Sequence, residues 1–525
     1  MSELSQSSFR TFTLLATLAA ATLTLTQCSG SPAPGAGTGA ASPSMGADGG
    51  FLITHATLVD GTGAPAVAGT AVRVRDGRIL EVGKLTPVEG EAVIDAGGKV
   101  LAPGFIDTHS HHDRGLDRMR DAKAAVGQGI TTIVVGQDGG SEPLAALFGR
   151  LEQQPVAVNV ASYIGHNSIR GQVLGERYQR EATPEEIERM RMRIAEEMAL
   201  GALGLSTGLE YDPGIYSSHD EVVTLARETA RLGGRYISHM RSEDREVWKA
   251  LEEIIEVGRQ TRMPVQVSHM KLAMTDWWGQ ADRYLGMMDA ARKEGIDITG
   301  DVYPYEYWQS GLSVLFPERD FDNRETAEFV LRSLAPPEGL LITGFAPDPT
   351  LVGKTVSQIA QQRGTDPAST VMWLLAEGEK DGHSVSVIGT SMHADDIAKL
   401  IAWPHSNICS DGGLNGLHPR GAGAFTRVLR EFVRERHVLT LEQAIHKMTG
   451  LAAQHMGLAD LGVIRAGAPA DLVLFDPDTV ADQATLETPV APSVGIEKVW
   501  VNGTLVLEGG EVTGAYPGRV VRRTP

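Results

Sequence analysis

The chain has 525 residues, of which 42% are hydrophobic and 22% are charged, a globular composition that excludes wholesale disorder and collagen-like structure. Its 47 Lys and Arg against 66 Asp and Glu residues give a net charge of −19. This charge argues against nucleic-acid binding, because a chain with excess acidic residues does not neutralise a phosphate backbone. Two cysteines, Cys28 and Cys409, cannot build a disulfide framework or a Cys-rich zinc module, so any metal site must use His and carboxylates.

The N-terminal segment predicts export from the cytoplasm. Residues 12–26 are apolar or small, a run that suits a signal-peptide core and is short for a membrane-spanning helix. Cys28 follows closely, as at a bacterial lipoprotein processing site, although Gln27 is larger than the residue usual before a lipidated Cys. We interpret residues 1–28 as a signal peptide, with Cys28 either lipidated or an unmodified thiol. Residues 29–50, rich in Gly, Ser, Ala and Pro, are a flexible linker. Both interpretations of Cys28 predict an exported protein, periplasmic or anchored to a bacterial membrane as a lipoprotein.

Short strand-like runs occur at both ends of the remaining chain. Asp76-Gly77 and Asn502-Gly503 are hairpin-turn pairs between such runs. Neither end has enough apolar residues to form a core alone. We therefore expect residues 51–103 and 465–525 to form one small β-sandwich domain together.

The middle of the chain alternates apolar runs with amphipathic helical segments, which is typical of parallel βα units. Helix starts are expected at Thr183, Ser218 and Thr440, each followed by residues that favour a first turn. The pattern predicts an α/β fold with a (β/α)8 barrel over residues 104–464. Residues 311–405 are too long for one connection and are expected to be an insertion over the barrel mouth. The expected strands are 100–107, 130–136, 156–165, 202–208, 235–238, 264–268, 297–303 and 406–410.

Ionisable residues follow the ends of these strands, and in a parallel barrel such ends converge on the face where catalytic groups lie. His109 and His111 alternate along a strand, so their rings point the same way and can bind one divalent cation. His239 and His269 can supply a second pair of nitrogens. A carboxylate from Glu210 or Asp138 could bridge two ions. Asp411 could bind an ion and also accept a proton from water activated there.

Several segments together resemble one known family. They include PGFIDTHSHHD, GITTIVVG, GALGLSTGLEYDPG, YISHMRSE, VQVSHMK, DVYPY, CSDGG and HPRGAGAFTRVLREFVRE. From about residue 51 to 520 the sequence resembles the N-acyl-D-amino-acid deacylases (D-aminoacylases) of the amidohydrolase superfamily. The resemblance implies a hydrolase that uses one or two Zn²⁺ ions to remove the acyl group from an N-acyl-D-amino acid. It implies metal ligands at His109, His111, His239 and His269, the catalytic base at Asp411, and substrate-carboxylate binding by Lys271, Arg420 and Tyr303 or Tyr305.

The sequence departs from the family pattern after the second strand. The family has a metal-ligand Cys there, in a context like VVGNCG, where this chain reads Val135-Gly136-Gln137-Asp138-Gly139. Superfamily relatives place a bridging carboxylate, often a carboxylated Lys, at the end of the fourth strand. We favour Glu210 as the bridge, because a strand-end side chain facing the mouth reaches two ions more naturally than one in a Gly-rich turn. Asp138 is the alternative.

The expected reaction is amide hydrolysis of a small N-acyl amino acid by metal-activated water, with Asp411 as general base. A dipeptidase or a cyclic-amide hydrolase on the same scaffold is an alternative, because the fold and the metal site do not determine the substrate. A non-catalytic surface lipoprotein that binds metal or solute is a further alternative, which the intact Asp411 disfavours. The sequence does not set the oligomeric state.

Overall fold

The computed structural model describes residues 50–380 and 384–523. The predicted signal peptide with Cys28, and all of the expected linker except residue 50, lie outside these residues. Within the described ranges, no helix combines the length and the apolar character needed to cross a membrane.

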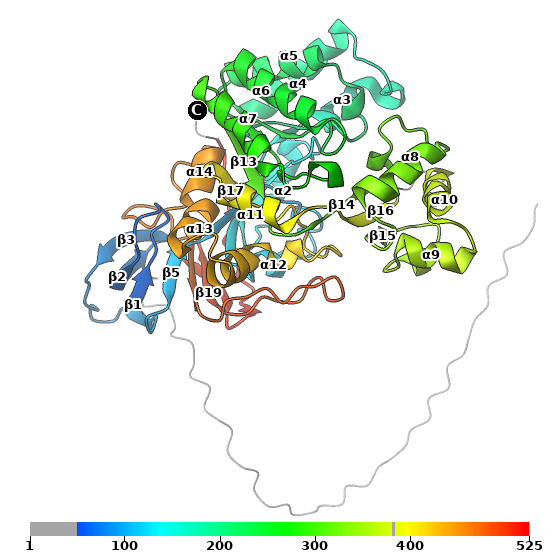
Figure 1. Ribbon diagram of the computed structural model, residues 1–525. Helices are drawn as coiled ribbons and strands as arrows, with labels where there is room; N and C mark the ends of the chain where they lie inside the picture. Colours follow the sequence, from blue (N-terminus) through cyan, green and yellow to red (C-terminus); the bar gives the residue numbers. More distant parts are fainter. Residues whose placement is uncertain (1–49, 381–383, 524–525) are drawn as a thin grey trace, which may run out of the picture. The chain divides into compact units, whose positions relative to one another are not determined.

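Strands from both ends of the described chain form one nine-stranded sheet in the order β21-β20-β19-β18-β5-β1-β2-β3, with β4 paired to β1 (Figure 1). The two ends meet where β5 pairs antiparallel with β18. Phe51 and Trp500, one from each end, stack with ring centroids 5.7 Å apart in the core of this sheet. The strands are β1 (Phe51–Leu58), β2 (Val67–Arg75), β3 (Arg78–Gly83), β4 (Ala92–Asp95), β5 (Val100–Pro103), β18 (Leu472–Phe475), β19 (Ile496–Val501), β20 (Thr504–Glu508) and β21 (Glu511–Val512).

Two hairpins of this sheet turn at the expected residue pairs. The pair Asp76 and Gly77 has φ of 52° and 75°, and the pair Asn502 and Gly503 has φ of 48° and 77°. Positive φ at both central residues gives the turn a twist that matches the twist of the flanking strands. The hairpins β2–β3 and β19–β20 are accordingly antiparallel.

The middle of the chain forms the predicted (β/α)8 barrel, and every strand pairing within it is parallel. Backbone hydrogen bonds from Asp411 N to His109 O (2.8 Å) and from His111 N to Gly412 O (2.9 Å) join the end of the first strand to the end of the last. The barrel strands are β6 (Phe105–Asp107), β7 (Ile130–Val135), β8 (Asn159–Ser162) continued by β9 (Ile164–Gly165), β10 (Gly204–Gly208), β11 (Arg235–His239), β12 (Val265–Val267), β13 (Ile298–Val302) and β17 (Ser406–Ile408).

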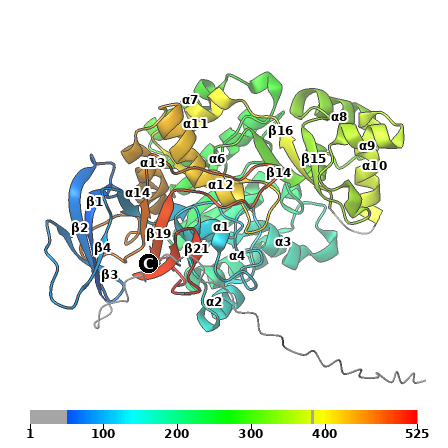
Figure 2. The same cartoon turned by 90° about the horizontal axis from the view of Figure 1, so that it is seen from below.

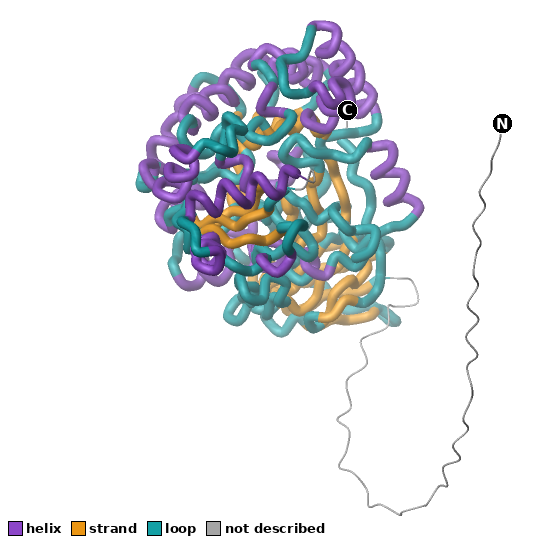
Figure 3. Tube along the Cα trace, turned by 90° about the vertical axis from the view of Figure 1, so that its right-hand side faces the viewer, coloured by secondary structure: helices purple, strands orange, loops and turns teal. Residues whose placement is uncertain are grey.

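Helices surround the barrel strands (Figure 3). The expected starts are confirmed, since Thr183, Ser218 and Thr440 cap their helices by accepting a backbone N–H bond. The last expected helix is broken at Thr449, whose φ of −134° and ψ of −89° are not helical. The helices are α1 (Lys123–Val126), α2 (Leu144–Gln153), α3 (His166–Leu174), α4 (Pro184–Ala199), α5 (His219–Arg231), α6 (Val247–Thr261), α7 (Ala281–Lys293), α11 (Ala394–Ala402), α12 (Arg420–Arg427), α13 (Leu441–Met448) and α14 (Gly450–Met456).

A second small sheet lies between β13 and α11 in the chain. Its strands β14 (Tyr307–Gly311), β16 (Ser386–Thr390) and β15 (Leu340–Gly344) are antiparallel in that order. Helix α9 (Val356–Arg363) packs on β15, and α10 (Pro367–Lys380) packs against both α9 and α8 (Arg324–Phe329). This part lies across the barrel from β1–β3 (Figures 1 and 2). It contributes Trp308, Val314 and Leu315 to the wall of the cavity at the barrel rim.

Candidate active site

The ionisable residues that follow the barrel strands meet at one rim, around a cavity of about 680 Å³. This is the geometry that parallel strands impose, since their carboxyl ends all reach the same face. Among the predicted residues, those lining the cavity are His111, Asp138, Glu210, His239, His269, Lys271, Tyr303, Asp411 and Arg420. His109 is fully buried directly beneath them. Tyr305 is not at the cavity: its ring packs against His418, and its hydroxyl lies 3.5 Å from the carbonyl oxygen of Pro419.

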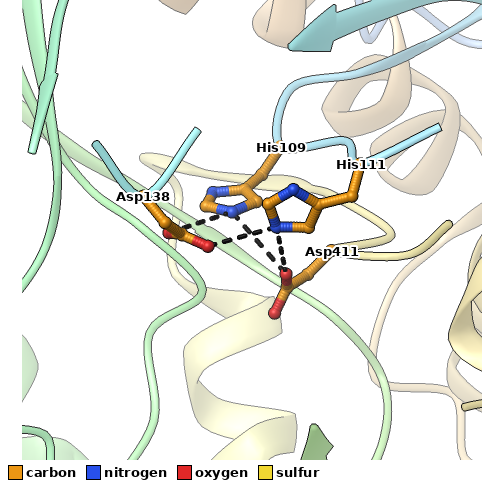
Figure 4. Close-up of side chains that lie close together, drawn as sticks. All are labelled: His109, His111, Asp138 and Asp411. Atoms are coloured by element: carbon orange, nitrogen blue, oxygen red, sulfur yellow. Dashed lines mark hydrogen bonds and ion pairs between the residues drawn. The ribbon is translucent and has the colours of Figure 1, made fainter. Parts of the chain in front are cut away.

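The first His pair lies between two carboxylates (Figure 4). His109 Nε2 is 3.3 Å from Asp138 Oδ1 and 3.6 Å from Asp411 Oδ1. His111 Nε2 is 3.1 Å from Asp138 Oδ2 and 3.3 Å from Asp411 Oδ1. The two Nε2 atoms and the two carboxylates therefore face a common centre, as the alternation of His109 and His111 predicts.

The second His pair lies on the other side of Asp138. His239 Nδ1 is 3.0 Å from His269 Nε2. Asp138 Oδ1 is 3.2 Å from His269 Nε2 and 4.0 Å from His239 Nδ1. Asp138 is thus shared by two of the three groups of ligand-type side chains in the described ranges, one with His109, His111 and Asp411 and the other with His239 and His269. The third group is Glu210, His239 and Glu243.

Of the two carboxylates considered for the bridge, Asp138 is the one that lies between the two His pairs. Glu210 Oε2 contacts His239 Nε2 at 2.9 Å, on the edge of the ring away from Asp138, and Glu210 is grouped with neither His109 nor His111. The reason is the backbone at Asp138, whose φ of 54° is left-handed. That conformation, which Asp tolerates better than most residues, turns the carboxylate out of the Gly-rich turn and into the centre.

Left-handed backbone recurs around the centre. His269 has a φ of 34° and Asp411 a φ of 49°. Non-glycine residues in this region store conformational energy, and such residues cluster at active sites where the surroundings hold them in place. The backbone conformation thus helps to direct three of the central side chains, those of Asp138, His269 and Asp411.

The donor set fits a zinc ion. Among the described residues, Nδ1 of the buried His109 has no hydrogen-bond partner, and its Nε2 meets only carboxylate oxygens, at 3.3 and 3.6 Å. Such weak pairing is costly for a buried polar group unless something else binds it. The side chains offer imidazole nitrogens and carboxylate oxygens, the ligands that Zn²⁺ takes where Cys is absent. Within each set the ligand atoms lie within 4.8 Å of one another.

Asp411 is held in its charged form. Burial raises the pKa of this carboxyl, but the opposing charges of Arg420 and of the neighbouring His residues outweigh burial and hold the pKa well below its usual range. Arg420 Nη1 lies 2.5 Å from Asp411 Oδ2. An ionised carboxylate at the centre can accept a proton from a water molecule bound there.

Beside Asp411, buried donor groups face the cavity without hydrogen-bond partners among the described residues. They are Nε of Arg420 and the hydroxyl of Tyr303, whereas Nη1 of Arg420 is paired with Asp411. The guanidinium carbon of Arg420 is 4.8 Å from the centroid of the Tyr303 ring. A guanidinium and a phenol in this arrangement are suited to bind a carboxylate, because Arg offers several donors in a fixed plane.

Two residues at the cavity were missed by sequence reasoning. Glu243, four residues after His239, binds Lys271 and lies against His269. Its sequence signal is the acidic residue that ends the segment YISHMRSE. A short loop separates this residue from the end of the strand. Tyr211 lines the cavity, with its ring centroid 4.3 Å from that of His239. Its signal is its position beside Glu210 at the end of β10.

Comparison with known proteins identifies similar chains. Residues 92–336 and 339–507 match the model described as "Amidohydrolase family". A D-aminoacylase of Alcaligenes xylosoxydans xylosoxydans is 35% identical over 499 residues, covering 90% of this chain and 97% of the relative. A solved D-aminoacylase with a binuclear metal centre is 34% identical with a TM-score of 0.81, covering 90% of this chain and 99% of that one. An N-acyl-D-glutamate deacylase of Bordetella bronchiseptica, solved with zinc and a phosphonate mimic of the tetrahedral intermediate, is 35% identical with the same TM-score and coverage.

Proposed function

Because the chain belongs to the amidohydrolase family, we propose that it is a zinc-dependent hydrolase that cleaves N-acyl-D-amino acids to a carboxylate and a free D-amino acid. The observation that carries this function is a pair of buried donors without partners among the described residues, Arg420 Nε and the Tyr303 hydroxyl, beside the cluster of His residues and carboxylates. A hydrolytic centre beside a carboxylate-binding group suits a substrate that has an amide and a free carboxylate one carbon apart.

One or two Zn²⁺ ions would be held by two sets of side chains that share Asp138. The first set is His109, His111, Asp138 and Asp411, and the second is Asp138, His239 and His269. A zinc ion held there would lower the pKa of a water molecule and polarise the substrate carbonyl. Glu210 orients the His239 ring by accepting a hydrogen bond from Nε2, which leaves Nδ1 facing the centre.

The chain's own residues then handle the proton and the substrate. Asp411, ionised and directed at the centre, takes the proton of the attacking water and passes it to the leaving amine nitrogen. Arg420 and Tyr303 hold the substrate carboxylate, and Lys271 adds positive charge at the same wall of the cavity. Holding the carboxylate and the carbonyl together leaves one direction for the side chain on the α-carbon, which is the basis for selecting one enantiomer.

The test is a substrate screen with the protein lacking residues 1–28. We expect bound zinc and hydrolysis of N-acetyl-D-amino acids, with the L enantiomers, dipeptides and hydantoins cleaved much more slowly. Removing the substrate's charge by converting its carboxylate to an amide should raise KM about 10- to 100-fold, since a hydrogen bond between charged groups contributes roughly 1.5–3 kcal/mol. Equal rates for an N-acetyl-D-amino acid and its amide would contradict carboxylate binding by Arg420, and faster cleavage of hydantoins or dipeptides would reassign the substrate.

We also propose that the protein is exported and anchored through lipid on Cys28. The apolar run over residues 12–26 and the position of Cys28 after it support this location. Expressed with its full N-terminus in a bacterium supplied with labelled palmitate, the chain should carry label and fractionate with membranes, and Cys28→Ser should abolish both. Secretion of unlabelled wild-type protein would support the alternative, export with an unmodified thiol.

A further inference from the structure

Glu243 is a buried carboxylate with three partners at the centre of the site. It lies in the loop after β11, with 7% of its surface exposed. Its two oxygens accept from Lys271 Nζ at 2.7 and 2.8 Å. Oε1 also lies 3.0 Å from His269 Nδ1, and Oε2 lies 3.8 Å from His239 Nε2. A carboxylate with these contacts can affect both a metal ligand and a cation at the substrate wall.

The contacts of His269 leave it two possible proton positions. Its Nε2 faces Asp138 Oδ1 at 3.2 Å, on the side of the proposed metal. Its Nδ1 is within hydrogen-bond distance of an acceptor, Glu243, at 3.0 Å and of a donor, Lys271 Nζ, at 2.7 Å. A neutral imidazole carries one proton, so Nδ1 either donates to Glu243 or accepts from Lys271. Only the first arrangement leaves the Nε2 lone pair free for a metal.

Glu243 favours the arrangement that leaves Nε2 free. Lys271 is itself buried, at 3% exposure, and Glu243 is the carboxylate with which it forms an ion pair among the described residues. While Glu243 engages the ammonium with both oxygens, it satisfies that group and also offers Nδ1 an acceptor. Without the negative charge of Glu243, the ammonium would donate to Nδ1, place the proton on Nε2, and leave an uncompensated positive charge beside the metal.

We propose that Glu243 is a positioning residue that keeps His269 competent to bind zinc by engaging its Nδ1 proton and the Lys271 ammonium together. The proposal rests on the proposed function for the presence of zinc, but it concerns zinc affinity and needs no substrate. When the charge of Glu243 is removed, Lys271 should weaken zinc binding. Substituting Lys271 as well should therefore restore the zinc affinity that the Glu243 substitution removes.

The experiment measures Zn²⁺ affinity by competition with a chromogenic chelator, for the protein lacking residues 1–28. Glu243→Gln should weaken affinity about 10- to 100-fold, the range found for partners of metal ligands. Lys271→Met should leave it within about threefold of wild type, since no ligand is lost. The double variant should recover most of the affinity lost in Glu243→Gln.

The matched control is Glu221→Gln, because Glu221 is likewise buried and bound to a His and an Arg, at 2.8 and 3.0 Å, but does not line the cavity. It should keep wild-type zinc affinity, and thermal unfolding will verify that each variant is folded. Unchanged affinity in Glu243→Gln, or a double variant as weak as Glu243→Gln alone, overturns the proposal. If zinc affinities follow the predicted order while no N-acyl-D-amino acid is cleaved, the substrate assignment fails and the role of Glu243 stands.

Discussion

Replacing Asp138 by Asn is expected to abolish most zinc binding and activity together. The Asp138 carboxylate is the group shared by both His pairs, with three imidazole nitrogens within 3.3 Å and the fourth at 4.0 Å. Partners of metal ligands contribute about 10- to 100-fold in metal affinity, so a carboxylate that contacts both sites should contribute more than about 100-fold. Metal analysis after dialysis and kcat/KM for an N-acetyl-D-amino acid measure the two losses.

The matched variant is Glu210→Gln, because Glu210 is the other carboxylate considered for the bridge. Glu210 contacts only the outer edge of His239 among the four His residues, and burial raises its pKa to about 6. Its substitution should weaken zinc about 10-fold, as for a residue that orients a ligand. If Glu210→Gln loses metal and activity while Asp138→Asn keeps both, Glu210 is the bridge as the sequence alone suggested.

Asp411→Asn is expected to reduce kcat about 10³-fold, within the range that general acid–base catalysis contributes. The amide keeps an oxygen that can coordinate zinc but cannot accept a proton. The loss of activity should therefore exceed the loss of bound metal. Initial rates at saturating substrate, with zinc content measured in the same samples, compare the two.

Asp212→Asn is the control for this substitution. Asp212 also lines the cavity, but its carboxylate pairs with Arg319 at 2.8 Å and, in the part of the chain that the structure describes, forms no ion pair with the four His residues. Its kcat should stay within about threefold of wild type, as is usual for substitutions of residues that do not contact the catalytic centre. Equal losses in the two variants would assign Asp411 a general electrostatic effect rather than proton transfer.

The barrel could be predicted from the sequence because each strand is a short apolar run and several helices have a capping residue at their start, as at Thr183, Ser218 and Thr440. The observed strands β10 to β13 lie within one or two residues of the expected runs. The ends of those runs also identified the His ligand candidates, since a strand end fixes the face on which its side chain lies. The predicted late helix is interrupted at Thr449-Gly450. A Cβ on Gly450 would meet the carbonyl oxygen of Gly61 at 2.2 Å. That close approach comes from a distant part of the chain.

The centre of the site could be predicted only in part. The left-handed φ of Asp138 decides that its carboxylate, rather than that of Glu210, faces both His pairs, and sequence reasoning does not supply that angle. Glu243 lies in a loop, so the pattern of ionisable residues at strand ends does not include it. Tyr303 and Tyr305 have equivalent positions around Pro304, but the chain turns there and packs Tyr305 against His418.

The pairing of β5 with β18 has a consequence for biosynthesis. Pro103 pairs with Leu472, so the edge of the N-terminal half-sheet stays open until roughly 370 further residues have left the ribosome. Exposed strand edges pair readily with other chains, and contacts of such long sequence separation form slowly. A nascent chain therefore cannot complete this sheet until its last strands emerge, a delay that would be compatible with the export proposed above.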